Sequence, residues 1–289
     1  MITLIIFFSG CSSKKDKLKG KKEKEVVVDW QKKTAPHELS PQQKKEILPN
    51  LKVFYSGTPK EWEIARKKIL AMGPTGAEVL AIFFIKFFGT LKNKNQDFTL
   101  YWTKAQRELI RLKEVAVPYV MLAMAHPNMG TSGKLLCSRV LVSIGKPSVP
   151  MLVKNLETGD HSFRRIVLET LGNIGDKSAG APIASLYKSL PKPNKSEEED
   201  EDIQDQDPFY GLRYYCLKAL GKLRSEDSLD AIQLALKDPI LIIRKKAVEA
   251  SLQFHSSQAL PLLQESAQVS LKSFPGYYRK LKLRIDSIQ

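Results

Sequence analysis

The histidines and cysteines are the residues whose chemistry could support catalysis or metal binding, and their spacing fits neither use. The histidines lie far apart in the sequence: His37, His126, His161 and His255. None belongs to an HExxH pair or lies near a cysteine at zinc-ligand spacing. The sequence also lacks a GxSxG motif, a phosphate-binding P-loop and a GxGxxG turn. We therefore predict no catalytic residue, no metal site, no cofactor and no enzyme activity.

Cys11 differs from the other cysteines because of the residues before it. Residues 2–8 are apolar except Thr3, and the small residues Ser9 and Gly10 precede Cys11. This segment resembles a bacterial lipoprotein signal, in which the cysteine thiol is acylated and the chain is cleaved just before it. A membrane-spanning helix needs about 20 apolar residues, so the short stretch fits a signal peptide better. The alternative is an apolar N-terminus on a cytosolic protein.

The lipoprotein resemblance implies where the protein is located. It predicts a signal peptide at residues 1–10, palmitate or a similar acyl chain on Cys11, and attachment to a membrane of the bacterial cell envelope, with the outer membrane favoured over the inner. Residues 12–33 then carry nine lysines against four acidic residues. Such a segment cannot bury enough apolar surface to fold. We therefore predict a flexible tether over residues 11–56.

The overall composition is that of a globular protein. Apolar residues make up 43% and charged residues 27%, which excludes wholesale disorder and a multi-pass membrane protein. The net charge is +15, a value often associated with nucleic-acid binding. Because an exported protein meets no genome, we expect no nucleic-acid partner.

From about residue 57 the apolar residues follow a helical spacing, and the pattern then repeats. Equivalent positions are occupied by Leu141, Leu171, Leu220 and Ser251, at spacings of 30, 49 and 31 residues. A cation lies seven residues before each of them: Lys134, Arg164, Arg213 and Arg244. A proline marks the start of the second helix of several pairs: Pro118, Pro150, Pro182 and Pro261. A long-period repeat of helix pairs predicts a stacked solenoid.

These residues resemble the HEAT repeat family, in the short form also found in phycobilisome-lyase-like proteins. Arg164, Arg213 and Arg244 match the arginine of the first helix, and Asp207 and Asp238, each followed by proline, match the aspartate that opens it. The resemblance implies that this arginine pairs with the aspartate, and that the fold is an all-α solenoid of about six hairpins over residues 57–289. A four-helix bundle or a tetratricopeptide array would show a different period.

Three further segments complete the predicted architecture. Cys137 and Cys216 each lie four residues before an equivalent leucine, so we expect both in the core rather than in a disulfide. Residues 191–207 form an insertion with eight carboxylates in its last eleven residues, which predicts a solvated loop; the alternative is a docking patch for a basic partner. Residues 81–89 are strongly apolar and predict a buried helix; membrane insertion is the alternative reading.

The HEAT resemblance implies that partners bind along the second helices of the pairs. Polar residues there give the candidate partner-binding set: Lys154, Asn155, Tyr187, Lys188, Gln233 and Lys237. Their charge predicts a mildly basic face and an acidic protein partner. Together with Cys11, these residues predict a membrane-anchored interaction scaffold. Two alternatives stay open: a cytosolic HEAT-repeat enzyme of lyase-like or DNA-repair type, and a purely structural envelope protein.

Overall fold

A computed structural model describes residues 41–89, 97–126, 129–191 and 209–289. The predicted signal peptide, Cys11, most of the tether, Asp207 and nearly all of the acidic insertion lie outside these residues. Within them every regular element is helical. The α-helices are α2 (Pro41–Ser56), α3 (Pro59–Ala71), α4 (Pro74–Gly89), α5 (Asp97–Arg111), α6 (Val117–Ala125), α7 (Thr131–Ile144), α8 (Val149–Lys154), α9 (His161–Ile174), α10 (Gly180–Ser189), α12 (Tyr210–Leu223), α13 (Leu229–Ala235), α14 (Leu241–Ser251), α15 (Leu260–Ser273) and α16 (Pro275–Asp286).

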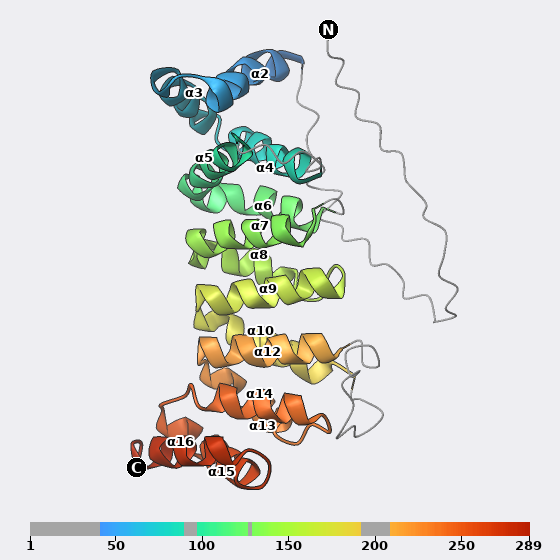
Figure 1. The fold of residues 1–289 in the computed structure, drawn as a ribbon, viewed down its shortest axis with the longest axis vertical. Helices are drawn as coiled ribbons and strands as arrows, with labels where there is room; N and C mark the ends of the chain where they lie inside the picture. The colour runs from blue at the N-terminus through green and yellow to red at the C-terminus, as the bar shows by residue number, and fades with distance from the viewer. Residues whose placement is uncertain (1–40, 90–96, 127–128, 192–208) are drawn as a thin grey trace, which may run out of the picture.

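The helices stack in chain order along the long axis of the molecule (Figure 1). First helices pack on first helices in the order α5, α7, α9, α12 and α14. Among the second helices, α4 packs on α6, α6 on α8, α10 on α13 and α13 on α15, while α8 contacts the 3₁₀ turn before α10. Each pair therefore buries its apolar face on the next pair, as a helical-repeat protein requires. This arrangement confirms the predicted all-α solenoid.

The turn inside each pair is built in a regular way. A short 3₁₀ turn precedes the second helix of five pairs, for example Lys146–Ser148 before α8 and Lys177–Ala179 before α10. Gly145 and Gly175 end the first helices of these two pairs with φ of 78° and 76°, a backbone conformation that favours glycine. The two glycines differ in ψ, which is −137° at Gly145 and 14° at Gly175, so the feature that these turns share is the 3₁₀ segment rather than one glycine conformation.

The core follows the repeat positions. The equivalent residues Leu141, Leu171, Leu220 and Ser251 are all fully buried. Gly221, which follows one of them, lies so close to the next first helix that a Cβ atom there would be 3.0 Å from Ala250 Cα. The leucine anchors the helix in the core, and the glycine lets α12 and α14 approach each other.

The N-terminal boundary of the folded part differs from the prediction. Residues 41–56 were expected in the flexible tether, but they form α2, which packs against α3. Ile47 and Phe54 on this helix are fully buried, and the Phe54 ring lies 6.1 Å from the Trp62 ring between centroids. The apolar residues Ile47, Leu51 and Phe54 have helical spacing, so burial of this face offsets the polar, lysine-containing composition of the segment.

Candidate interaction surface

The six candidate partner-binding residues lie on or just after the second helices α8, α10 and α13, but two of them are not on the surface. Lys154, Lys188, Gln233 and Lys237 are exposed. Asn155 is 0% exposed and Tyr187 is 5% exposed, so the predicted surface role is wrong for both.

Asn155 is buried because it stabilises the turn after α8. Its side-chain amide donates to the Met151 carbonyl at 2.8 Å, and its side-chain oxygen accepts from Thr158 Oγ1 at 3.0 Å. These bonds satisfy an amide that has no contact with water, which explains why a polar residue is tolerated there.

Three of the four exposed members of the set make contacts across neighbouring repeat units. Lys188 on α10 pairs with Asp230 on α13. Lys237 Nζ lies 3.1 Å from the Glu265 carboxylate on α15, and Gln233 Nε2 donates to the same carboxylate at 2.6 Å. Lys188 and Lys237 are therefore partly neutralised by Asp230 and Glu265, two acidic residues that sequence reasoning had not included in the surface.

A pocket of about 270 Å³ lies where α10, α12 and α13 meet. Its lining residues are Tyr187, Lys188, Leu190, Arg213, Leu234, Lys237, Asp238 and Pro239. Three of the six candidate residues thus gather at one site, together with two residues predicted to have a structural role. Lys188 and Lys237 are exposed, whereas Tyr187, Arg213 and Asp238 are buried.

The buried residues of this pocket form a polar network. Arg213 Nη1 donates to the Pro191 carbonyl at 2.7 Å, and Arg213 Nε lies 4.0 Å from Asp238 Oδ2. The Tyr187 hydroxyl donates to the same carboxylate at 3.4 Å, and the Ile240 backbone N–H donates to Asp238 Oδ1 at 2.9 Å. Asp238 thus accepts hydrogen bonds from α10 and from its own turn, and the Arg213 charge on α12 lies nearby.

Burial dominates the electrostatics of this network. It raises the pKa of Asp238, with the Ile240 N–H and the Arg213 charge opposing the shift, and it raises the pKa of Tyr187. The Tyr187 hydroxyl therefore stays protonated and remains a donor. The lining of the pocket contains three cations, Lys188, Arg213 and Lys237, and one carboxylate, Asp238. Asp230 and Glu265, outside the lining, pair with Lys188 and Lys237, so only part of this positive charge remains for an anionic group.

The three arginines predicted to be structural share one contact. Each donates to carbonyl groups near the end of the preceding pair: Arg164 Nε to Leu156 at 2.8 Å, Arg213 to Pro191, and Arg244 Nη1 to the carbonyls of Asp238 and Pro239 at 2.8 and 2.9 Å. They therefore satisfy carbonyls that a helix end leaves without intrahelical partners. Arg213 in addition approaches Asp238 in the next unit.

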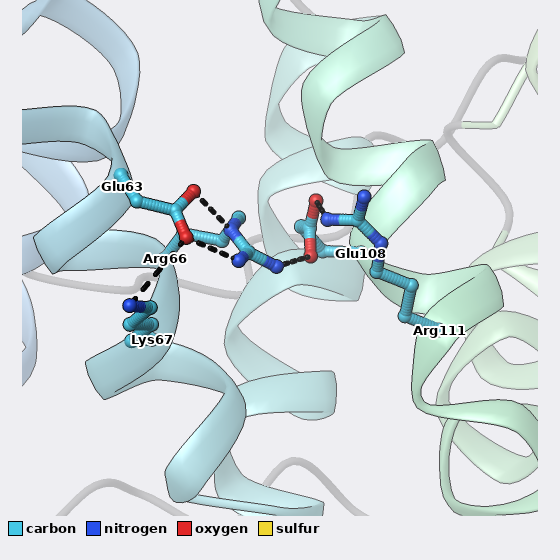
Figure 2. A network of polar contacts seen from close by, with 5 residues as sticks. All are labelled: Glu63, Arg66, Lys67, Glu108 and Arg111. Atoms are coloured by element: carbon cyan, nitrogen blue, oxygen red, sulfur yellow. Dashed lines mark hydrogen bonds and ion pairs between the residues drawn. The ribbon is translucent and has the colours of Figure 1, made fainter. Parts of the chain in front are cut away.

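A second polar network, which sequence reasoning missed, joins α3 to α5 (Figure 2). Glu108 on α5 is fully buried and accepts from Arg111 Nη1 at 2.7 Å and from Arg66 Nη1 at 3.5 Å. Arg66 also donates through Nε to Glu63 at 2.7 Å, and this hydrogen bond lowers the pKa of Glu63. Lys67 lies 3.9 Å from the same carboxylate. A buried charge with charged partners on both sides ties the α2–α3 hairpin to the stack.

The two cysteines within the described residues are free and buried. Burial raises the pKa of the Cys137 and Cys216 thiols to about 12, so both stay protonated at neutral pH. Among the described residues there is no group of three or more His, Cys, Asp or Glu side chains that could hold a metal ion. In the same part of the chain, no helix is long and apolar enough to span a membrane. Helix α4 contains the whole of the apolar stretch 81–89 and ends at Gly89.

The repeated, stacked hairpins define a helical-repeat protein. The family model described as HEAT repeats matches residues 202–273, which cover α12 to α15. This match supports a HEAT-repeat protein. No curated protein matches the chain. One similar solved structure is the crystal structure of an engineered protein from the Northeast Structural Genomics Consortium, with 14% identity, a TM-score of 0.36, and coverage of 83% of this chain and 94% of that chain.

Proposed function

We propose that the protein is a non-catalytic interaction scaffold, attached to a membrane of the bacterial cell envelope through an acylated Cys11, that binds a protein partner along its second helices. The residues before Cys11 and the lysine-rich segment after it support the anchor. Stacked repeats support the scaffold role, because they present a long continuous surface built from many units.

The observation that carries the binding proposal is the pocket between α10 and α13. It combines apolar walls, Leu190 and Leu234, with Lys188 and Lys237 and the buried Arg213. Leu234 is 43% exposed, so an apolar contact is available beside the positive charges. An Asp or Glu side chain of a partner protein fits this chemistry, and we propose that the partner is acidic at this point.

The binding proposal is tested by cross-linking intact cells and recovering the protein with its partner. A Lys154→Glu, Lys188→Glu and Lys237→Glu variant reverses the exposed charges on three second helices or the turns that follow them. We expect loss of the partner from this variant. The matched control reverses Arg139, Lys222 and Lys245, which lie on first helices. Unchanged recovery with the second-helix variant would remove the proposal.

The anchor is tested by metabolic labelling with palmitate, followed by membrane fractionation. The wild-type protein should carry label and sediment with membranes, and Cys11→Ala should lose both properties. An unlabelled wild-type protein in the soluble fraction would instead favour the cytosolic HEAT-repeat alternative. If removal of the whole protein weakens the cell envelope and cross-linking identifies no specific partner, a purely structural role would be favoured.

A further inference from the structure

The charges of the solenoid are distributed unequally between its two rows of helices. The first helices α7, α9, α12 and α14 contain ten Lys or Arg residues and two Glu residues, a net of +8. The second helices α8, α10, α13 and α15 contain three Lys residues and two acidic residues, a net of +1. The positive charge of the repeat region therefore lies mainly on the first helices.

Four of the ten cations point into the stack, and six do not. Arg164, Arg213 and Arg244 bond to carbonyls of the preceding pair, and Lys134 lies 3.9 Å from Asp160. The remaining six occupy outer positions of the first helices: Arg139, Arg165, Lys218, Lys222, Lys245 and Lys246. We call these six residues the outer cations.

Only two of the outer cations are neutralised by the two glutamates. Lys218 lies 2.7 Å from Glu169, and Lys246 pairs with Glu249. Arg139, Arg165, Lys222 and Lys245 are exposed and take part in none of the ion pairs among the described residues. Four charges of one sign thus remain available on neighbouring helices.

Two tyrosines lie between these cations. The Arg165 guanidinium lies 4.6 Å from the centre of the Tyr215 ring and donates to its hydroxyl at 3.2 Å. Lys246 Nζ lies 4.6 Å from the centre of the Tyr214 ring. These contacts join α9 to α12 and α12 to α14, so they hold charges and rings in one surface across three units.

Apolar side chains extend the same surface at both ends. Leu135 on α7 is 41% exposed and Ile242 on α14 is 43% exposed. Leu135 occupies the same repeat position as the exposed Arg165, six residues before the buried leucine, so it also faces outward. Cations mixed with tyrosine and aliphatic side chains are the combination found at membrane–water interfaces.

We propose that the outer face of α7, α9, α12 and α14 lies against an anionic phospholipid bilayer. Figure 1 shows these four helices as successive rows along the stack, so their charges are spread along the molecule rather than gathered in one groove. A bilayer presents negative headgroups over the whole of that length, which matches a charge spread over four successive helices. The second helices then face away from the lipid, where a protein partner has access.

This inference rests on the proposed membrane attachment, which keeps the solenoid at high local concentration near the bilayer. The face itself does not need the acyl chain. Each Lys or Arg near an anionic surface strengthens binding about fivefold, and salt screens the attraction. Reversal of three outer cations should therefore weaken binding by at least about tenfold, even though the lysine-rich segment at residues 12–33 is retained.

The test is co-sedimentation of the purified full chain, carrying Cys11→Ser, with vesicles of phosphatidylglycerol and phosphatidylethanolamine or of phosphatidylcholine alone. One variant carries Arg139→Glu, Lys222→Glu and Lys245→Glu. The matched variant carries Lys154→Glu, Lys188→Glu and Lys237→Glu, which gives the same net charge. Circular dichroism and thermal melting check that both variants fold like the Cys11→Ser parent.

We expect the parent and the second-helix variant to bind phosphatidylglycerol vesicles equally, the first-helix variant to bind at least about tenfold more weakly, and none to bind phosphatidylcholine vesicles. Equal loss in the two variants would overturn the proposal, since the tether and total charge would then explain binding. Binding of a glutamate-rich peptide through the outer cations, without vesicle binding, would overturn it in favour of an acidic protein.

The result of the vesicle assay is independent of the palmitate-labelling test of the acyl anchor. If Cys11 is labelled by palmitate but the two variants sediment alike, only the proposal for the first-helix face fails. If the first-helix variant alone loses vesicle binding while Cys11 is not labelled, the lipid-binding face stands and the acyl anchor fails.

Discussion

Gly180 offers a sharp test of how neighbouring repeat units fit together. It is the first residue of α10, and it lies against Ser225, the residue before the 3₁₀ turn Glu226–Ser228 of the next unit. A Cβ atom on residue 180 would lie 2.3 Å from Ser225 Cβ and 2.5 Å from Ser225 Oγ. Non-bonded carbon atoms normally approach to about 3.5 Å, and a Cβ atom cannot move away without its backbone.

We expect Gly180→Ala to lower the free energy of unfolding by about 2 kcal/mol, because overpacking costs about 1–3 kcal/mol and the lower chain entropy of alanine offsets part of it. Ser225→Gly should cost about 1 kcal/mol, mainly through the added freedom of the unfolded chain. Because Ser225→Gly removes the atoms that would clash with the Cβ atom added by Gly180→Ala, the double variant should lose only about 1 kcal/mol of unfolding free energy. Independent effects of the two substitutions would instead add to about 3 kcal/mol.

Urea denaturation followed by far-ultraviolet circular dichroism measures the four unfolding free energies of this cycle. A favourable coupling of about 2 kcal/mol is expected between two residues 45 positions apart in the sequence. Additive losses would refute the close packing of α10 on the next unit.

Three further predictions concern the polar networks and the cysteines. Glu108→Ala should lower the unfolding free energy by about 2 kcal/mol, since Arg66 and Arg111 lose their buried acceptor. The control variant Glu63→Ala, on the surface, should lower it by less than about 1 kcal/mol. Equal losses for the two variants in urea denaturation would contradict the buried network. Cys137 and Cys216, with pKa values near 12, should resist iodoacetamide at pH values near 8 until the protein is unfolded. Mass spectrometry maps the labelled cysteines, and rapid labelling of the native protein would contradict their burial. Burial would raise the pKa of Glu249, but hydrogen bonds from Lys246 and Tyr277 outweigh burial and hold the pKa below its ordinary value of 4.5. This carboxylate therefore stabilises the fold fully above pH 4.5, and it stabilises the fold less as the pH falls towards the folded-state pKa. Glu249→Gln should flatten the dependence of unfolding free energy on pH in that acidic range, and parallel curves for the two proteins would contradict this assignment.

The repeat architecture could be predicted because it depends on local pattern. The spacing of apolar residues fixes which side of each helix is buried, and Gly145 and Gly175 occupy turns that favour glycine. Segment 41–56 was missed because its lysines and polar residues dominate its composition. The three apolar residues Ile47, Leu51 and Phe54 carried the signal, since they lie on one side of a helix.

The candidate site was predicted less well, because polarity does not say which way a residue faces. Asn155 follows a helix of only six residues, where the helical period gives little guidance, and it is buried as a turn-stabilising residue. Tyr187 is buried because Asp238, 51 residues away, accepts a hydrogen bond from its hydroxyl. Contacts between units at such distances, including those of Glu108, depend on how the pairs stack and cannot be read from one sequence.

The central claim, that each hairpin packs directly on the next in chain order, is tested most directly by zero-length carbodiimide cross-linking with mass spectrometry. This reagent joins lysines to carboxylates that are in contact. We predict links between Lys218 and Glu169, between Lys188 and Asp230, and between Lys237 and Glu265, each of which connects consecutive units. Intramolecular links within the repeat region that skip a unit, in place of these three, would contradict the stacked arrangement.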